Sequence, residues 1–492
     1  MENLSPQIPL YLTFDDVLLL PQHSDVLPSA VVTKTNFTKK LSLNLPFISA
    51  AMDTVTESAM AIAMAKSGGI GVLHRSLTPE AQADEVRKVK RASSIIIKEP
   101  FTVDINTPLS NAKLMMKQNN ISGLPVVDEH NALVGILTSR DIKSATSKSA
   151  TVESVMTTNL ITANEPTSVE AARELMLQNK IEKLPILKDG KLYGLMTLRD
   201  ISQVYKYPLV NLDDHGHLMV AAAVGTDITT EKRIAYLVEA GVDAIIIDTA
   251  HGHSEKVIDT FRRVRNEYSD LQIIVGNIAT SAAAHDLIEL GVDALKVGIG
   301  PGSICTTRIV AGVGAPQLSA IQSVYAAAKN SGVPIIADGG IKNSGDAVKA
   351  LAAGASSVML GTMVAGCLES PGEQIMRDGH LYKSFRGMGS LGAMKRGSRD
   401  RYFQDHHDVD EELEAKLVPE GVEGMVPFKG DVNSVLYQMA GGLRAGMGYI
   451  GASTISQMAD QAQFVQVTSA ALRENHPHDV IITQEAPNYS GS

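Results

Sequence analysis

The segments LVEAGVDAIIID (237–248) and LIELGVDALKVG (287–298) share one arrangement of residues, and a third copy, LAAGASSVML (351–360), follows later in the chain. In each copy a helix-like stretch ends at a glycine, and a run of apolar residues begins after it. Glycine often ends helices because it adopts the left-handed backbone conformation at little cost. A strand that is apolar at nearly every position is buried on both faces, which is typical of parallel sheets. The repeat therefore predicts helices that alternate with parallel, buried strands.

Apolar runs of this kind occur eight times along the chain. Eight successive units of strand and helix predict a closed (β/α)8 barrel, known as a TIM barrel, within the α/β class. An open, doubly wound sheet is the alternative, and the number of units favours the barrel. The runs are PFISAAMD (46–53), GGIGVLH (68–74), MVAAAVG (219–225), AIIIDTAHG (244–252), QIIVGNIA (272–279), ALKVGIGPG (294–302), PIIADGGI (334–341) and SVMLGTMVAG (357–366).

The regular spacing of these runs is interrupted twice. The first interruption, between the second and third runs, contains a duplicated segment, in which GLPVVDEHNALVGILTSRDI (123–142) aligns with KLPILKDGKLYGLMTLRDI (183–201). We therefore expect an inserted pair of α/β modules at 93–206, divided into about 93–150 and 151–206, with the barrel formed by 1–92 and 207–492. The second interruption, at about 380–432, is rich in glycine, charge and aromatic residues. It predicts a long irregular insertion, either a functional lid or a disordered loop, at the catalytic face after the eighth strand.

Composition excludes several classes of protein. The net charge of −10 and the lack of a long basic run do not favour nucleic-acid binding. Two cysteines cannot form a disulfide framework and fit a reducing cytosol, so we expect a cytoplasmic protein. The first residues, MENLSPQIPLYLTFDD, are not typical of a signal peptide. No stretch approaches the roughly 18 apolar residues of a membrane span.

The loop GIGPGSICTTR (298–308) follows the sixth predicted strand and carries one of the two cysteines. In a barrel this loop lies at the C-terminal mouth, where catalytic residues gather. A thiol there is a candidate nucleophile, while the alternative is a tight turn with a small buried side chain. The polar neighbours of Cys305 favour catalysis, whereas Cys367 lies in an apolar segment and fits the buried alternative.

A phosphate site is predicted beside this loop. ADGG (337–340) and LGTMVAG (360–366) end the seventh and eighth strands, and the loops after those strands often bind phosphate in such barrels. We expect Asp338 to accept hydrogen bonds from ribose hydroxyls. The alternative is that ADGG only ends a strand. The residues expected to hold the phosphate are Ser303, Gly340, Gly361 and Thr362.

Two weaker patterns are set aside. The spacing G-x-G-x-x-G occurs at 387–392 and 446–451, but neither copy follows a clear buried strand of a dinucleotide-binding unit. A metal site built on Asp248, His251 and His253, or on DHHD (405–408), is not supported by the spacing of the residues.

Taken together, the motifs resemble the family of inosine 5′-monophosphate (IMP) dehydrogenases and GMP reductases, and within it the IMP dehydrogenases. The likeness extends from FDDVLLLP (14–21) to RENHPHDV (473–480), and the insert resembles a tandem pair of CBS modules. GMP reductases typically lack the insert and the RYFQ segment. The motifs that carry the resemblance are GPGSICTTR (300–308), ADGGI (337–341), RGMGSLGAM (386–394), RYFQ (401–404) and VPEGVEG (418–424).

The resemblance implies an NAD-dependent oxidoreductase that converts IMP to xanthosine 5′-monophosphate (XMP), the committed step of GMP biosynthesis. Cys305 would add to C2 of the purine, and loss of hydride to NAD⁺ would leave a thioimidate that water hydrolyses. A mobile flap would bring Arg401 and Tyr402 into the site for hydrolysis, and Thr307 with Glu420 would offer a second proton route. The alternatives are a GMP reductase and a non-catalytic, nucleotide-sensing regulator.

The resemblance also assigns ligands to residues. The substrate contacts are Ser303, Asp338, Gly339, Gly340, Gly361, Thr362, Phe385, Gly387, Met388, Gly389 and Glu420. The NAD contacts are Asp248, Thr249, His251, Asn277, Gly298 and Gly300. A potassium ion would bind backbone carbonyls of Gly300, Gly302 and Cys305, and a neighbouring subunit would add Glu474, Asn475 and His476. This sharing implies a homotetramer, and whether tetramers pair into octamers stays open.

Three details of the family pattern remain open. The inserted modules are expected to bind adenine or guanine nucleotides through Asp141 and Asp200, although both residues could simply cap the helices that follow. Phe385 stands where the family usually has a tyrosine whose hydroxyl reaches the phosphate. The segment RENH (473–476) replaces the usual RESH in that half of the cation site.

Overall fold

The chain folds into two compact units, which are described separately. One unit contains Met1–Ala92, Leu209–Asp213 and Leu218–Ser492, and the other contains Ser93–Pro208 and Asp214–His217. The computed structural model describes residues 8–92, 97–98, 100–119, 121–144, 150–402 and 417–489.

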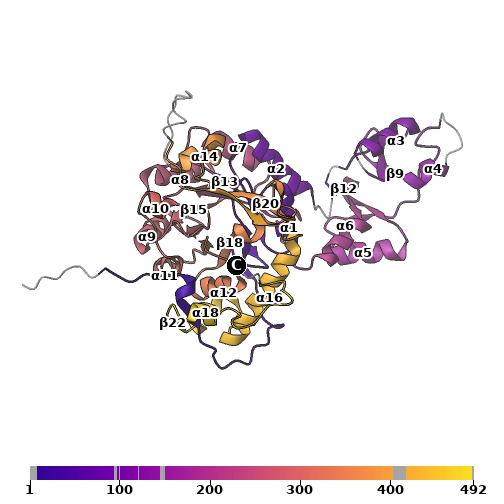
Figure 1. The fold of residues 1–492 in the computed structure, drawn as a ribbon. Coiled ribbons are helices and arrows are strands. Elements are labelled where there is room, and N and C mark those ends of the chain that lie inside the picture. The colour runs from indigo at the N-terminus through magenta and orange to yellow at the C-terminus, as the bar shows by residue number, and fades with distance from the viewer. Residues whose placement is uncertain are drawn as a thin grey trace, which may run out of the picture. The chain divides into compact units, whose positions relative to one another are not determined.

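The first unit is a closed parallel barrel, which confirms the predicted TIM barrel (Figure 1). All eight predicted runs supply a strand, and every neighbouring pair of strands is parallel in the described chain. Nearly all strand residues are buried, because side chains fill the barrel on one face and helices cover the other. The strands, in their order around the barrel, are β4 (Phe47–Ser49), β5 (Ile70–Leu73), β13 (Val220–Val224), β14 (Ala244–Asp248), β15 (Gln272–Ile278), β16 (Ala294–Val297), β17 (Ile335–Asp338) and β18 (Ser357–Leu360).

The repeated joints hold the N-terminal ends of the barrel strands in place. The three joint glycines, Gly241, Gly291 and Gly354, all have positive φ, as the end of a helix before a strand requires. Two residues after the first two glycines, Asp243 accepts a hydrogen bond from the first N–H of β13 (2.7 Å), and Asp293 accepts one from β15 (2.8 Å). The joint before β14 is thus bonded to the N-terminal end of β13, and the joint before β16 is bonded to that of β15.

Helices follow the strands and surround the barrel (Figure 1). Within the described residues, no helix combines the length and apolar character that crossing a bilayer requires. The helices of this unit that cover the barrel or carry site residues are α1 (Ser58–Lys66), α2 (Pro79–Arg91), α7 (Thr230–Glu239), α8 (Glu255–Glu267), α9 (Ser281–Leu290), α10 (Thr307–Val310), α11 (Gln317–Ala328), α12 (Ser344–Ala352), α13 (Thr362–Ala365), α16 (Val432–Ile450), α17 (Met458–Gln461) and α18 (Ala471–Glu474).

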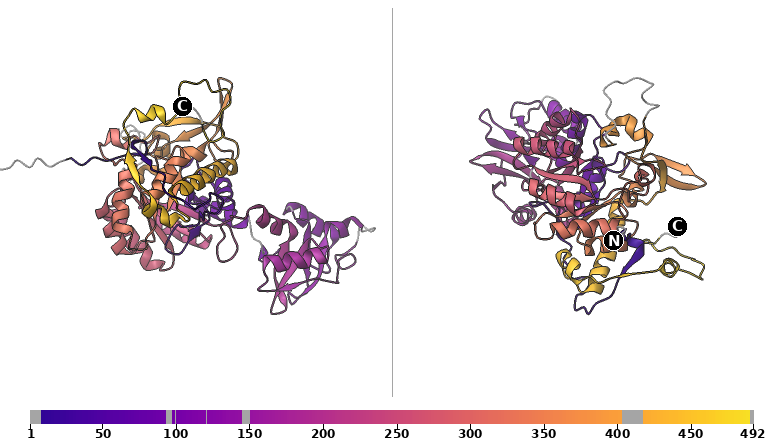
Figure 2. Two further views of the ribbon diagram at one scale, coloured as in Figure 1. Left: turned by 90° about the horizontal axis from the view of Figure 1, so that it is seen from below. Right: turned by 90° about the vertical axis from the view of Figure 1, so that its left-hand side faces the viewer.

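The region 380–432 is more regular than expected. It contributes β20 (His380–Arg386) and β21 (Glu423–Pro427), which pair antiparallel beside β19 (Gln374–Arg377) and lie outside the barrel (Figure 2). The prediction of an irregular insertion was wrong here. The residues of β20 and β21 that pair are far apart in the sequence, and no local pattern indicates such a pairing. Short helical turns follow at α14 (Leu391–Ala393) and over Met394–Tyr402. Phe403 and Gln404 of the RYFQ motif lie outside the described residues.

Short pairings bring the ends of the first unit's described chain onto the barrel. A turn at Phe14–Asp16 precedes β1 (Val17–Leu19), which pairs antiparallel with β22 (Phe464–Gln466). A hairpin is formed by β2 (Thr35–Asn36) and β3 (Ser42–Leu43).

The second unit contains two small sheets, each packed with helices. One sheet has the order β7-β8-β9 and the other β10-β11-β12-β6. Strand β6 lies in the segment assigned to the first module, yet it pairs with β12 of the second, so the expected boundary at about 150 does not separate the sheets. The elements are β6 (Ile97–Lys98), β7 (Val103–Asp104), α3 (Leu109–Gln118), β8 (Gly123–Val127), β9 (Leu133–Thr138), α4 (Ser139–Ser144), β10 (Ala163–Asn164), α5 (Val169–Gln178), β11 (Lys183–Lys188), β12 (Lys191–Thr197) and α6 (Leu198–Lys206).

Candidate active site

Cys305 lies at the mouth of the barrel, in the loop between β16 and α10. Its N–H donates to the Gly302 carbonyl (3.1 Å), and its Sγ lies 3.2 Å from Oγ1 of Thr307, the first residue of α10. Cys305 is partly exposed, whereas Cys367 is fully buried and burial raises the pKa of Cys367 to about 12. Of the two cysteines, Cys305 is therefore the one that a ligand can reach.

Two segments far from this loop in the sequence form a layered arrangement with it through backbone hydrogen bonds. Thr306 N–H donates to the Glu420 carbonyl (3.0 Å), and Val422 N–H donates to the Ile304 carbonyl (3.0 Å). On the other side, Glu420 N–H donates to the Gly389 carbonyl (2.9 Å). The motifs GPGSICTTR, VPEGVEG and RGMGSLGAM thus form one layered wall around Cys305.

The wall closes one side of a cavity of about 330 Å³. Most residues predicted to act in catalysis or to bind the substrate, NAD or the potassium ion line it together. They are Asp248, Asn277, Gly298, Gly300, Gly302, Ser303, Cys305, Thr307, Asp338, Gly339, Gly340, Gly361, Thr362, Phe385, Gly387, Met388, Gly389, Arg401, Tyr402 and Glu420.

Small polar groups gather at one end of the cavity. Ser303 Oγ and Thr362 Oγ1 are 2.5 Å apart and share a hydrogen bond. Gly339 and Gly340 both have positive φ, so the chain turns sharply after β17 and exposes its backbone to the cavity. Phe385 is buried, and its Cζ lies 3.9 Å from the position that a Cβ at Gly361 would take. This end has the hydroxyls and close backbone that an anion requires.

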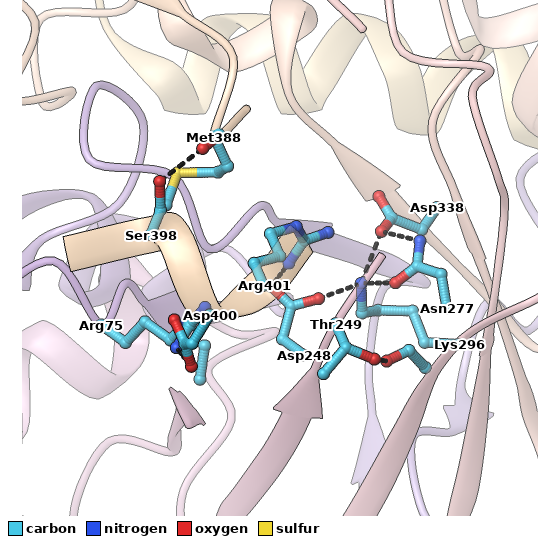
Figure 3. A network of polar contacts seen from close by, with 12 residues as sticks. Arg75, Asp248, Thr249, Asn277, Lys296, Asp338, Met388, Ser398, Asp400 and Arg401 are labelled. Atoms are coloured by element: carbon cyan, nitrogen blue, oxygen red, sulfur yellow. Dashed lines mark hydrogen bonds and ion pairs between the residues drawn. The ribbon is translucent and has the colours of Figure 1, made fainter. Parts of the chain in front are cut away.

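A buried lysine lies at the centre of a network of polar side chains (Figure 3). Lys296 on β16 is fully buried, and its Nζ lies 2.8 Å from Asp248 Oδ1 and 2.6 Å from Asp338 Oδ2. Nζ also donates to Oδ1 of Asn277, whose Nδ2 donates to Asp338 Oδ2 (2.9 Å). Sequence reasoning missed Lys296. The signal was a single charged residue inside the otherwise apolar run ALKV.

Arg401 reaches into the same cluster from the flap segment, which we define as the turn Arg399–Tyr402. Its Nη1 pairs with Oδ2 of Asp248. Burial opposes ionisation of Asp248, but Arg401 and Lys296 outweigh it and lower the pKa of Asp248 to about 2. Burial likewise opposes the charge of Arg401, and Asp248 raises its pKa above the usual value. Both groups are therefore ionised at neutral pH.

Tyr402 packs on the backbone of the wall. A Cβ added at Gly389 would lie 2.7 Å from its Cζ, so glycine leaves the space that the tyrosine ring occupies. Burial raises the pKa of Tyr402 to about 12.

Some predicted residues are not among the cavity lining. Thr249 is buried and bonds through its backbone to Gly276 (2.9 Å), and His251 is exposed. Glu474, Asn475 and His476 lie in and after α18, and His476 bonds Tyr489 of its own segment (2.9 Å). These three residues are not among the cavity lining, which includes Gly300, Gly302 and Cys305.

Asp141 and Asp200 lie in the second unit with the geometry of helix caps. Asp141 Oδ2 accepts from both N–H and Oγ1 of Thr138 (2.7 Å each). Asp200 Oδ2 accepts from Oγ1 of Thr197 (2.5 Å), whose Oγ1 in turn accepts from the Asp200 N–H (3.2 Å). This observation fits the capping alternative and leaves nucleotide binding as a prediction.

Comparisons with known proteins place these features in context. Residues 11–478 match the family described as "IMP dehydrogenase / GMP reductase domain". The chain is similar to the inosine-5′-monophosphate dehydrogenases of Halalkalibacterium halodurans (52% identity, covering 97% of this chain and 98% of the relative) and Aquifex aeolicus (53%, covering 99% of each). A crystal structure of a Trypanosoma brucei GMP reductase variant with guanosine 5′-monophosphate is also similar, with 41% identity, a TM-score of 0.86 and coverage of 97% of this chain and 100% of that chain.

The last comparison bears on the alternative of a GMP reductase. The insert at 93–206 makes up more than a fifth of this chain, so an alignment that covers 97% of the chain includes most of it. The presence of the insert therefore does not by itself exclude a GMP reductase.

Proposed function

The chain belongs to the family of IMP dehydrogenases and GMP reductases, and from this premise we propose that it oxidises IMP to XMP with NAD⁺ as hydride acceptor. The matches confirm the family and the enzyme class that the motifs predicted. The observation that carries the proposal is one cavity in which Cys305 faces Arg401, Tyr402 and the cluster around Lys296.

Cys305 supplies the nucleophile for the first half of the reaction. Its sulfur adds to C2 of the hypoxanthine ring, hydride then leaves C2, and a thioimidate remains on the sulfur. Thr307 Oγ1, 3.2 Å from Sγ, can donate a hydrogen bond that stabilises the attacking thiolate. The polar end of the cavity, with Ser303 and Thr362, would hold the phosphate and so fix C2 against the sulfur.

The residues proposed for NAD fit its nicotinamide riboside. Asp248 and Asn277 at the ends of β14 and β15 offer a carboxylate and an amide for hydroxyl and carboxamide groups. Gly298 and Gly300 have positive φ and let the backbone approach a ligand closely. When bound, NAD⁺ supplies the acceptor for the hydride. Because Arg401 pairs with Asp248 in this structure, Arg401 and the cofactor would use the same carboxylate in turn.

The second half is hydrolysis of the Cys305 adduct. Water adds to C2, the C2–S bond breaks and the Cys305 thiolate is restored. One proton of the water stays on the purine product, and the other must be removed. The family assigns this proton to Arg401, yet the contact with Asp248 raises the pKa of Arg401. Arg401 can orient water while it is paired, and it must part from Asp248 to accept a proton. Thr307, with Glu420 on the same wall, would serve as the second route.

The proposed potassium site is formed by the loop carbonyls of Gly300, Gly302 and Cys305. Carbonyl oxygens suit such a cation, and the positive φ of Gly300 fits a tight loop around one. Completing the site with Glu474 to His476 would require another subunit, which is the basis for proposing a tetramer.

The direct test of function follows absorbance at 340 nm with purified protein, IMP, NAD⁺ and K⁺. We expect steady NADH formation that depends on IMP, and a Cys305→Ala variant should form none. GMP reduction is the second candidate, because the similarity to a GMP reductase extends over 97% of this chain and so includes most of the insert. Oxidation of NADPH on addition of GMP, without NADH formation from IMP, would replace the proposal by this reaction.

Arg401→Ala separates the two halves of the reaction. We expect a normal burst of NADH in the first turnover, followed by a stall, because the adduct forms but water is not activated. Rapid quenching and mass spectrometry should find the purine nucleotide on Cys305. Loss of the burst would instead place Arg401 in binding or hydride transfer.

A further inference from the structure

Asp400, the residue before Arg401, forms a buried ion pair that the reaction described above does not use. Its Oδ2 accepts a hydrogen bond from Nη1 of Arg75, and both residues are at most 5% exposed. Arg75 follows β5, so the pair joins segments 325 positions apart in the chain. Figure 3 shows this pair close to the pair formed by Arg401 and Asp248.

Neighbouring residues of the flap segment therefore carry opposite charges and meet opposite charges on the barrel. Asp400 meets Arg75, while Arg401 meets Asp248. A shift of the segment by one residue would bring like charges together at close range in a buried site, which is strongly unfavourable. The Ala250 N–H also donates to the Arg401 carbonyl (3.0 Å). These contacts specify one register of the segment.

Gly225, directly after β13, provides the space for the pair. A Cβ at this position would lie 2.2 Å from Arg75 Nη1 and 2.2 Å from Asp400 Oδ2. The φ of Gly225 is outside the left-handed region, so its backbone would accept alanine. The ion pair, and not the backbone, is what demands glycine here.

Arg75 and Asp400 depend on each other. Nη2 of Arg75 and Oδ1 of Asp400 are buried without a hydrogen-bond partner among the described residues. Oδ2 of Asp227 lies 4.0 Å from Arg75 Nη1, at the outer limit of an ion pair. Loss of either partner therefore leaves the other charge buried and poorly compensated.

We propose that Arg75 and Asp400, seated over Gly225, form a latch that positions Arg401 in the cavity. Both are positioning residues, since neither lines the cavity around Cys305. The proposal rests on the hydrolytic role proposed for Arg401. Displacing a catalytic group by about 1 Å lowers its rate on the order of 100-fold, so breaking the latch should slow hydrolysis and spare hydride transfer.

The first experiment compares burst and steady-state kinetics of Asp400→Asn, Arg75→Gln, the double variant and Gly225→Ala. We expect the NADH burst to stay within about twofold of the unmodified enzyme, while kcat falls roughly 10- to 100-fold and the Cys305 adduct accumulates. The double variant should be no slower than the slower single variant, because both changes break one contact. Gly345→Ala, in open space on α12, is the matched control and should keep both rates.

The second experiment does not depend on catalysis. Trypsin cleaves after arginine, and cleavage after Arg401 requires the flap segment to leave the cavity. We expect Asp400→Asn and Gly225→Ala to raise the rate of cleavage at this bond at least about tenfold, with the rate of cleavage at bonds outside the flap segment unchanged. Mass spectrometry of the fragments identifies the bond.

The outcomes separate this inference from the proposed function. If Arg401→Ala does not stall but Asp400→Asn still exposes the Arg401 bond, the latch stands and the hydrolytic role of Arg401 is wrong. Unchanged cleavage in Asp400→Asn and Gly225→Ala would overturn the latch. Equal slowing of burst and steady state would also overturn it, since the pair would then support binding or folding in general.

Discussion

Lys296 shows how single residues organise this site. It is the one charged residue of a buried strand, and it compensates carboxylates from two other strands, Asp248 and Asp338. Burying a charge is costly unless it is paired, so each member of this cluster requires the others. The cluster holds Asp248 ionised at the place where Arg401 arrives.

Phe385→Tyr tests the phosphate end of the cavity. The Cζ of Phe385 points toward Gly361, so a hydroxyl on it would reach the proposed phosphate position. A hydrogen bond to a charged group is worth about 1.5–3 kcal/mol, and we expect the KM for IMP to fall roughly tenfold with little change in kcat. Phe101→Tyr, exposed and in the other unit, is the control. An unchanged KM would mean that this side chain does not face the phosphate.

The pH dependence of turnover tests Tyr402. Burial raises the pKa of its hydroxyl to about 12, so Tyr402 keeps its proton throughout pH 7–10. Tyr402→Phe should therefore change the height of the kcat profile but leave its shape in this range. The measurement is kcat at saturating IMP and NAD⁺ for both proteins. Disappearance of a limb of the profile would show that Tyr402 itself titrates there.

At the scale of elements, the repeated joints decide how strands and helices meet. The third joint uses a hydroxyl in place of a carboxylate, since Ser356 Oγ accepts from the Ile335 N–H of β17 (3.3 Å). Asp243 and Asp293 accept from the equivalent strand ends. Each joint satisfies a backbone donor that closing the barrel would otherwise leave buried.

Gly71→Ala tests packing between β5 and α1. An added Cβ would lie 2.5 Å from Cα and 2.6 Å from Cβ of Ala61, so the helix must move away from the strand. Such overpacking costs about 1–3 kcal/mol, and we expect the denaturant midpoint to fall. Gly345→Ala should leave the midpoint equal or slightly higher, because alanine favours the helix. Equal midpoints for Gly71→Ala and the unmodified protein would mean that α1 can move away from β5 without loss of stability.

At the scale of the whole molecule, the two units have separate cores. Every residue lining the cavity belongs to the first unit. The proposed catalytic cavity and the predicted nucleotide site therefore lie on different units, and any influence of one on the other would have to pass between the two units.

Nucleotide binding by the second unit can be tested in the full chain by calorimetry with ATP, ADP and GTP. We expect binding, and Asp200→Ala should weaken it at least about tenfold if its carboxylate contacts ribose. Thr197→Ala removes the same cap bond but keeps the carboxylate, so it should retain affinity. Equal loss in both variants would mean that Asp200 acts only as a cap, and no heat with any nucleotide would reject sensing.

Local patterns in the sequence predicted much of the fold and part of the site. Apolar runs indicate strands buried on both faces, and joint glycines indicate left-handed turns. Both features could be predicted because they depend on residues within a few positions of one another. The motifs around Cys305 located the wall of the cavity, although their packing against one another was not deducible. The strands β20 and β21 were missed because their pairing depends on residues about 40 positions apart.

By itself, then, the sequence determined that strands and helices alternate and which loops carry reactive side chains. Tertiary structure alone decided which charges meet. Lys296 joins Asp248 and Asp338, and Asp400 meets Arg75, only because closing the barrel brings the ends of distant strands to one mouth. Such pairs depend on distance in space and on exclusion of water, and a linear pattern contains neither.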